Sequence, residues 1–198
     1  MTLTELGKKA KETAAFLGVL SSARKNEGLK AAAQALLEGE EEILTANQED
    51  VIKATMEGMS PALVDRLELT PARIQSMAEG LLSVAALDDP VGEVVSMKVR
   101  PNGLQIGQKR VPLGVIGMIY EARPNVTADA FGLCFKSGNA VILKGGSDAL
   151  ESNKAIVKWL QEGLKRVGLP QSALQLITDT DRETTKELMR MRDYVDVL

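Results

Sequence analysis

The alternation of strand and helix patterns after residue 113 limits the possible folds more than any other feature of this sequence. Short apolar runs, typical of strands buried on both faces, are found at 115–120, 140–143, 174–177 and 194–198. Helical patterns lie between them at 127–136, 149–167 and 180–191, the last opened by a capping box of Thr180 and Glu183. Elements that alternate at these lengths predict an α/β fold with a doubly wound parallel sheet.

Residues 1–90 show helical patterns throughout. Thr2 and Glu5 form a capping box at the start of the first helix. Ser60-Pro61 and Thr70-Pro71 each place a capping residue before a proline at the first helical position. We therefore predict a helical N-terminal region before the sheet.

A different pattern joins these two regions. Val95, Met97 and Val99 alternate with polar residues, and Asn102-Gly103 is a strong hairpin signal because both positions of a tight turn need positive φ. Leu104 and Ile106 resume the alternation, so we predict an antiparallel hairpin with one apolar face. Because an isolated two-stranded hairpin is only marginally stable in water, we expect this face to pack against another surface. Packing against its own domain and burial in a subunit interface both remain open.

Composition excludes several classes of function. The 198 residues include no histidine and one cysteine, which excludes Ser-His-Asp triads, Cys-His pairs and Cys-rich zinc sites, so no metal is expected. A net charge of −3 predicts no nucleic-acid partner. No apolar run approaches the roughly 20 residues of a membrane span, and the N-terminus lacks a signal-peptide pattern. A cytoplasmic protein without membrane contact is expected.

The segment Lys144-Gly145-Gly146-Ser147 has the composition of a phosphate-binding turn. Paired glycines allow close approach of the backbone, Ser147 can donate at the following helix N-terminus, and Lys144 adds a positive charge. The spacing matches neither GxGxxG nor the Walker pattern. A turn without a ligand remains an alternative.

The segment after the first strand is unusual for a plain connection. Arg123 can make a bidentate contact with a carboxylate or phosphate. Asn125 follows a proline, and an amide held on a rigid loop at a strand end is a plausible oxyanion donor. The alternative is that Asn125 only initiates a turn and that Arg123 pairs with a nearby carboxylate. Cys134, by contrast, lies inside a helix without a histidine, which indicates a buried structural thiol.

Several segments resemble the γ-glutamyl phosphate reductases, a family of the aldehyde dehydrogenase superfamily. The resemblance covers essentially the whole chain and is most specific over residues 119–127. The matching segments are 119–127, 137–143, 145–146, 182–191 and 194–196. The family resemblance implies an aldehyde-dehydrogenase-like fold and NADPH-dependent reduction of γ-glutamyl phosphate to glutamate 5-semialdehyde in proline biosynthesis.

The resemblance also implies roles for individual residues. Asn125 matches the oxyanion asparagine of the superfamily, and Arg123 is expected to bind the acyl-phosphate substrate. Lys144 matches a position that contacts the adenosine ribose, so the segment from Lys144 through Gly145 and Gly146 to Ser147 is expected to bind NADP. Ser147 stands where NAD-preferring relatives often carry glutamate, and loss of that carboxylate would admit a 2′-phosphate.

The expected domain organisation follows from the same resemblance. Residues 1–90 form the helical part of the cofactor-binding domain, 91–112 an oligomerisation hairpin, and 113–198 the Rossmann-like core. The implied partners are a second copy of the chain, through the hairpin, and a glutamate kinase. Family enzymes are about twice this long, and their catalytic cysteine lies in a second domain. The strand pattern at 194–198 runs to the last residue, so we expect a truncated chain that is inactive alone. The alternative is a stand-alone nucleotide-binding or interaction module.

Overall fold

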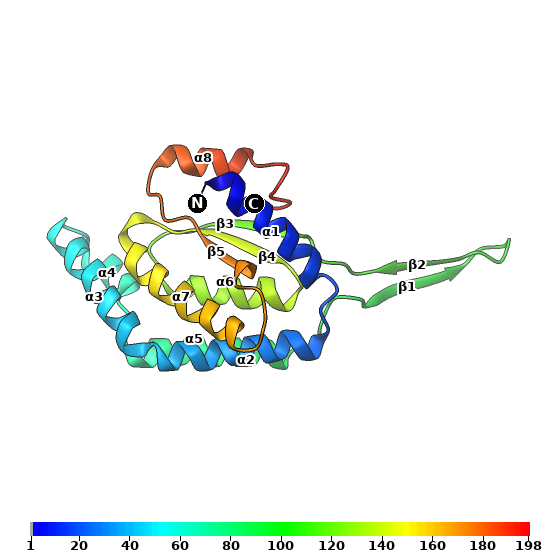
Figure 1. The fold of residues 1–198 in the computed structure, drawn as a ribbon, viewed down its shortest axis with the longest axis horizontal. Helices are drawn as coiled ribbons and strands as arrows, with labels where there is room; N and C mark the ends of the chain where they lie inside the picture. The colour runs from blue at the N-terminus through cyan, green and yellow to red at the C-terminus, as the bar shows by residue number, and fades with distance from the viewer. Residues whose placement is uncertain (1) are drawn as a thin grey trace.

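A three-stranded parallel sheet lies at the centre of the computed structural model, which describes residues 2–198 (Figure 1). The strands are β3 (Val115–Ile119), β4 (Ala140–Lys144) and β5 (Leu174–Leu176), in the order β3-β4-β5. The expected strand at 194–198 is reduced to a parallel bridge between Val197 and Ile116, on the free edge of β3. The strand order therefore reverses beside β3, and the predicted α/β fold is confirmed.

Helices cover both faces of the sheet (Figure 1). They are α1 (Leu3–Leu17), α2 (Ser22–Glu38), α3 (Glu40–Met56), α4 (Pro61–Leu67), α5 (Pro71–Ala86), α6 (Asn125–Lys136), α7 (Leu150–Arg166) and α8 (Arg182–Arg190), with short 3-10 turns η1 (Ser147–Ala149) and η2 (Gln171–Ala173). Helices α6 and α7 pack on one face and are backed by α2 and α5, while α1 and α8 lie on the other face. None of the helices between residues 2 and 198 is both long and apolar enough to cross a bilayer.

Local capping explains where several helices begin. The Thr2 N–H donates to the Glu5 carboxylate at 2.8 Å and the Glu5 N–H donates to the Thr2 hydroxyl at 3.3 Å, which confirms the capping box of α1. At α8 the predicted cap is wrong. Asp181, rather than Thr180, accepts the N–H of Glu183, at 3.0 Å. A carboxylate caps a helix N-terminus as well as a hydroxyl does, and sequence spacing alone did not separate the two.

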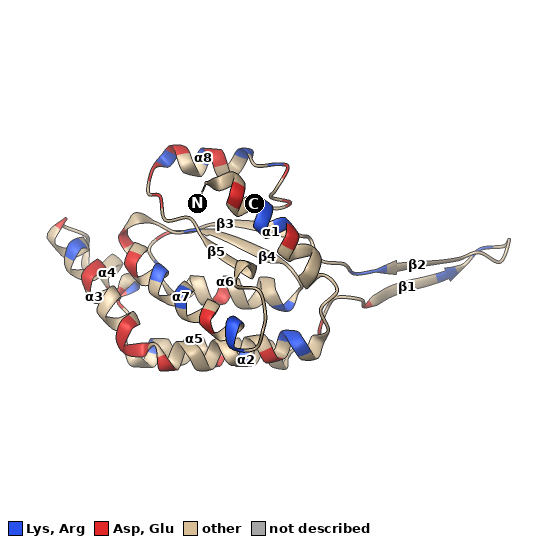
Figure 2. Ribbon diagram, in the orientation of Figure 1, with Lys and Arg blue, Asp and Glu red and all other residues tan. Residues whose placement is uncertain are grey.

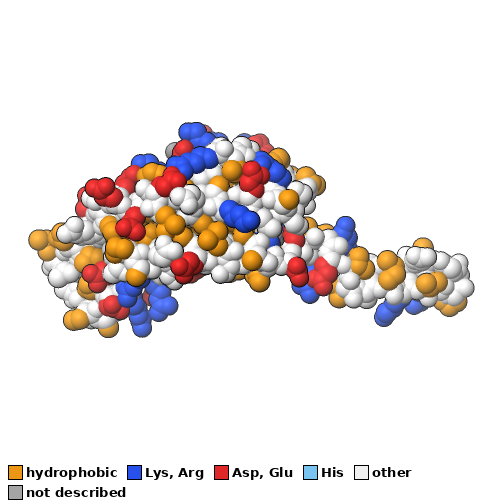
Figure 3. All heavy atoms as spheres, turned by 90° about the horizontal axis from the view of Figure 1, so that it is seen from below, with side chains coloured by type: hydrophobic (Ala, Val, Ile, Leu, Met, Phe, Trp, Pro, Cys, Tyr) orange, Lys and Arg blue, Asp and Glu red, His pale blue; other side chains and the backbone are white. Residues whose placement is uncertain are grey.

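The hairpin of β1 (Val94–Val99) and β2 (Gln105–Lys109) extends away from the body of the molecule (Figure 1). Its hydrophobic side chains are exposed, and Figure 3 shows them along the projecting arm. The exposed fractions of Val99 and Ile106 are 69% and 51%. Packing of the hairpin against its own domain is therefore wrong for this chain.

Two details of the hairpin also differ from expectation. Gly103 has φ of +85°, but no non-glycine residue among those described has positive φ, so Asn102 does not form the expected tight turn. The turn is longer, with the Gly103 N–H donating to the Arg100 carbonyl at 2.9 Å. In the register, Ile106 pairs with Lys98 while Met97 pairs with Gly107. Because paired residues share a face, apolar side chains lie on both faces rather than on one.

A buried cluster of charges lies where the hairpin leaves the body. Lys25 of α2 is fully buried, and its Nζ lies 2.6 Å from Asp89 Oδ2 in the segment before β1. Ser22 also donates to Asp89, at 2.7 Å. Lys136, at the end of α6, donates to Asn26 at 2.6 Å. Elsewhere both signs of charge are distributed over the helices (Figure 2).

Candidate functional site

The loop that leaves β3 is closed by short backbone hydrogen bonds. The Arg123 N–H donates to the Glu121 carbonyl at 2.8 Å, and the Val126 N–H donates to the Arg123 carbonyl at 3.0 Å. Helix α6 begins at Asn125, two residues earlier than the sequence indicated. The loop lies beside the reversal of strand order, which is where open α/β sheets bind ligands.

The side chain of Asn125 is exposed in the first turn of α6. Its Nδ2 lies 3.4 Å from Oδ2 of Asp129, one helical turn later. An amide nitrogen carries two hydrogens, so a bond to Asp129 leaves one N–H for a ligand oxygen. Burial raises the pKa of Asp129, and the hydrogen bond from Asn125 opposes this rise. The arrangement presents one oriented amide donor, which is what stabilisation of an oxyanion requires.

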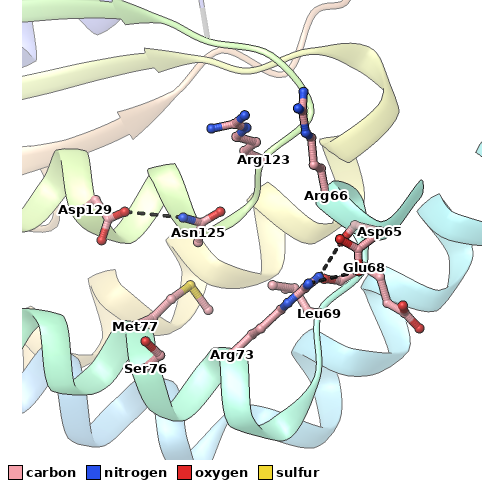
Figure 4. A pocket seen from close by; sticks show the side chains of 10 residues that line it. All are labelled: Asp65, Arg66, Glu68, Leu69, Arg73, Ser76, Met77, Arg123, Asn125 and Asp129. Atoms are coloured by element: carbon pink, nitrogen blue, oxygen red, sulfur yellow. Dashed lines mark hydrogen bonds and ion pairs between the residues drawn. The ribbon is translucent and has the colours of Figure 1, made fainter. Parts of the chain in front are cut away.

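Asn125 opens onto a pocket of about 340 Å³ between α6, α5 and the α4–α5 connection (Figure 4). This volume lies at the lower end of the range for metabolite sites. Arg123 lines the same pocket, so two of the predicted site residues share one cavity. The lining residues are Asp65, Arg66, Glu68, Leu69, Arg73, Ser76, Met77, Arg123, Asn125 and Asp129.

Three arginines line the pocket, and only one of them has polar partners. Arg73 donates to the carbonyl of Glu68 at 2.6 Å, to the carbonyl of Asp65, and to the carboxylate of Asp65 at 3.1 Å. Within residues 2–198 the guanidinium groups of Arg66 and Arg123 have no hydrogen bond or ion pair. Arg73 thus shapes the wall, while the other two arginines bring unpaired positive charge to the pocket.

The predicted nucleotide loop follows β4, the strand next to β3. Lys144 is buried as the last residue of β4, and its Nζ donates to the Gly145 carbonyl at a long 3.4 Å. Ser147 is exposed and begins η1, and its hydroxyl donates to Asp148 at 3.3 Å. Ser147 stands where the family resemblance implies the loss of a carboxylate, but the next residue, Asp148, supplies one.

A chain of polar side chains connects the two loops. The hydroxyl groups of Tyr120 and Thr127 are 2.6 Å apart, and Thr127 donates to Asn153 Oδ1 at 2.8 Å. Burial raises the pKa of Tyr120 to about 12, so it remains protonated and donates to Thr127. A Cβ on Gly145 would lie 2.4 Å from Asn153 Nδ2, so any larger residue there would require the Asn153 side chain to move. A Cβ on Gly146 would meet its neighbours at ordinary contact distance.

The N-terminus of α7, which follows the predicted nucleotide loop, is capped from within the protein. Asp50 of α3 accepts the N–H of Ser152 at 2.7 Å, its hydroxyl at 2.6 Å, and the N–H of Glu151 at 3.3 Å. Burial raises the pKa of Asp50. These amides are therefore occupied, and the helix terminus does not offer them to a ligand phosphate.

Cys134 is buried inside α6, and burial raises the pKa of its thiol to about 11. A thiol with this pKa remains protonated at neutral pH and is a poor nucleophile. The interpretation of Cys134 as a structural residue agrees with this environment.

Sequence reasoning missed Asp129, Arg66 and Asp50. Asp129 was within reach, because it lies four residues after Asn125 and the two share a helix face. The other two reach their positions only through the packing of α3 and α4 against the core, for which the sequence carries no local signal.

Comparison with known proteins relates this architecture to one family. The model of the aldehyde dehydrogenase family matches residues 3–197. A γ-glutamyl phosphate reductase of Clostridium beijerinckii is 56% identical over 192 residues, which are 97% of this chain and 46% of that protein. The chain therefore spans about half the length of the curated relatives it matches.

Solved structures show the same relationship. The γ-glutamyl phosphate reductase of Thermotoga maritima superposes with a TM-score of 0.96 at 46% identity, over 98% of this chain and 47% of that one. The enzyme of the same name from Saccharomyces cerevisiae gives a TM-score of 0.90 at 30% identity, over 100% of this chain and 51% of that one.

Proposed function

The chain belongs to the aldehyde dehydrogenase family, and we propose that it is the cofactor-binding part of an NADPH-dependent γ-glutamyl phosphate reductase. Membership of this family implies an oxidoreductase that uses a nicotinamide cofactor. The proposed reaction is reduction of γ-glutamyl phosphate to glutamate 5-semialdehyde and phosphate, a step of proline biosynthesis. The similarity to reductases of this name supports the proposal.

The position of Asn125 is the observation that carries the proposal. It stands at the N-terminus of α6, beside the strand-order reversal, and lines a pocket that contains unpaired arginine charge, and its bond to Asp129 uses only one of its two amide hydrogens. An acyl phosphate develops negative charge on its carbonyl oxygen when it is attacked, and an oriented amide stabilises that charge. Arg123, two residues earlier, would hold the phosphate oxygens.

The residues around β4 fit a dinucleotide. Asn153 Nδ2 is buried beside Gly145 without a partner among residues 2–198, and Lys144 brings a positive charge with only one long hydrogen bond. We propose that Lys144, Gly145, Gly146 and Ser147 hold the adenosine ribose and 2′-phosphate of NADPH. When bound, this cofactor supplies the hydride for the reduction.

The chain leaves one catalytic role unfilled. Acyl transfer in this family would need an activated thiol, and Cys134 is buried with a raised pKa. We propose that the nucleophile comes from the half of the enzyme that this chain does not cover. This chain alone is then inactive, and its residues bind cofactor, orient the acyl phosphate and stabilise the oxyanion.

The proposed partners follow from the exposed surface. The hairpin places apolar side chains in solvent, as a subunit contact requires, and we propose a homo-oligomer formed through it. We also propose a complex with a glutamate kinase, because the acyl-phosphate substrate is reactive. A cytoplasmic location belongs to the same proposal, because the reaction is a step of cellular amino-acid synthesis.

A fusion protein tests the function. It consists of this chain followed by the C-terminal half of the Clostridium beijerinckii relative, assayed with glutamate 5-semialdehyde, phosphate and NADP⁺. We expect NADPH formation by the fusion protein and none by the chain alone. A folded fusion protein that binds NADPH without turnover, or turnover by the chain alone, would contradict the proposal.

Two variants identify the role of the amide. Asn125→Ala should lower kcat of the fusion protein by about 10²–10³, the usual effect of losing one oxyanion donor, with little change in cofactor affinity. Gln75→Ala, which removes an exposed amide on α5, is the matched control and should leave kcat unchanged. A raised KM with unchanged kcat would make Asn125 a binding residue instead.

A further inference from the structure

The charges that line the Asn125 pocket do not cancel by internal pairing. Asp65 is paired with Arg73. Arg66 and Arg123 have no ionic partner within residues 2–198, and the only hydrogen-bond partner of Asp129 in that part of the chain is the neutral amide of Asn125. Figure 4 shows Arg66 on the α4 wall, opposite Asn125 and Asp129 on α6. The carboxylate of Glu68, another lining residue, has no ionic partner within residues 2–198 either. The pocket therefore presents two positive and two negative groups to a ligand, and Asp129 is the negative group on the same helix as Asn125.

Asp129 has no cationic partner in the pocket. Its carboxylate is exposed and accepts a single long bond of 3.4 Å, from the neutral amide of Asn125. A positive charge within contact distance stabilises the ionised form of a carboxylate. Among the residues that line the pocket, each arginine lies on another segment, and none is paired with Asp129.

We propose that Asp129 and Arg66 recognise the α-amino-acid end of the substrate. Asp129 accepts hydrogen bonds from the α-ammonium group, and Arg66 donates to the α-carboxylate from the opposite wall. Arg123, next to Asn125 in the chain, is left for the acyl phosphate. This inference rests on the proposed function, because it assigns the substrate's remaining charged groups within the same pocket.

The spacing on α6 suits a ligand of this length. With hydrogen bonds of about 2.9 Å at each end, the 3.4 Å between Asn125 Nδ2 and Asp129 Oδ2 allows the acyl oxygen and the ammonium nitrogen to lie up to roughly 9 Å apart. A glutamyl chain fits within this distance. An ammonium group on Asp129 also leaves Asn125 a hydrogen to donate, since the amide nitrogen carries two and only one is bonded to Asp129.

The experiment measures binding of three stable probes to this chain by NMR, from the shifts of the Asn125 side-chain amide. The probes are L-glutamate, glutarate, which lacks the ammonium group, and 4-aminobutyrate, which lacks the α-carboxylate. We expect L-glutamate to bind at least fivefold more tightly than either analogue. No detectable binding of L-glutamate, or glutarate binding equally well, would overturn the proposal.

Single variants assign each charge. Asp129→Asn keeps an acceptor for Asn125 and should remove the preference for L-glutamate over glutarate while leaving the preference over 4-aminobutyrate. Arg66→Gln should do the reverse. Arg190→Gln on α8, outside the pocket, is the control and should change neither ratio. If the variants retained both preferences, other residues would bind the α-ammonium and α-carboxylate groups.

The outcomes also separate this proposal from the proposed function. If the fusion protein turns over and Asp129→Asn leaves the probe ratios unchanged, the recognition proposal alone fails. If the chain discriminates among the probes as expected and the fusion protein is inactive, the reductase assignment fails and the amino-acid site stands.

Discussion

Replacing Asp89 by asparagine should destabilise the chain strongly, because Asp89 is the counter-ion of a fully buried lysine. Lys25 has no exposed surface, and besides Asp89 its Nζ has, within residues 2–198, only one long bond, 3.3 Å to the carbonyl of Lys136. Removing one partner of a buried ion pair costs about 3–5 kcal/mol, since the other charge stays in a low dielectric. Asparagine keeps an acceptor, which favours the lower end, about 3 kcal/mol.

Chemical unfolding in urea measures this change. Since folded domains are stable by only about 5–15 kcal/mol, a loss of about 3 kcal/mol should shift the midpoint clearly at unchanged m-value. For a chain of this size it should also lower Tm by roughly 6–12 °C. Glu93→Gln is the matched control. Its ion pair with Arg110 lies nearby but is more than half exposed on both sides, and such pairs contribute about 0–1 kcal/mol.

A second substitution tests the cause. Lys25→Met removes the buried ammonium group, so the double variant of Lys25→Met and Asp89→Asn should be more stable than Asp89→Asn alone. The reasoning would be refuted if Asp89→Asn cost less than about 1 kcal/mol, or if Lys25→Met failed to recover stability in the Asp89→Asn background.

Three further predictions concern acid, helix capping and cofactor choice. Burial opposes ionisation of Asp89, but hydrogen bonds from its partners, Lys25 foremost, hold its pKa below the ordinary value. Its stabilisation is therefore complete above the unfolded pKa of about 3.9 and is lost as pH falls through the lower folded value, so urea midpoints should fall less steeply with acid in Asp89→Asn. Asp50→Ala should cost about 1–2 kcal/mol in urea unfolding, as a lost N-cap does, and Asp50→Asn less; equal losses would contradict the capping role. In the fusion protein, fluorescence titration should show that Ser147→Glu weakens NADPH at least about tenfold, less at high salt, and spares NADH. Lys144→Ala should weaken NADPH more than NADH; equal changes for both cofactors would refute the loop assignment.

The sheet could be predicted from sequence because each element carries its own signal. The apolar runs of β3 and β4 and the long amphipathic pattern of α7 depend on neighbours within a few residues. The hairpin shows the limit of such reasoning. Its strands were found, but a longer turn around Gly103 moved Ile106 to the face of Lys98 instead of that of Met97. A change in turn length shifts the register, and local alternation does not reveal it.

The candidate site divides in the same way. Asn125, Arg123 and Lys144 were found because they follow strands, and the ends of parallel strands lie at one edge of a sheet. Arg66 lies on α4, about 60 residues before Asn125 in the chain. It lines the pocket only because α4 and α5 pack beside α6. Asp50 takes the α7 amides by the same kind of long-range contact. Charges that complete a site from another layer depend on tertiary packing.

The register of the hairpin restricts the shape of anything that covers it. Met97 and Val99 lie on one face and Ile106 lies on the other, all exposed. A flat surface packed against the hairpin would bury one face and leave the other exposed to solvent. Burial of both faces requires either one partner with a groove that encloses the hairpin or two partners that pack on opposite faces. An assembly built on this arm would therefore interlock.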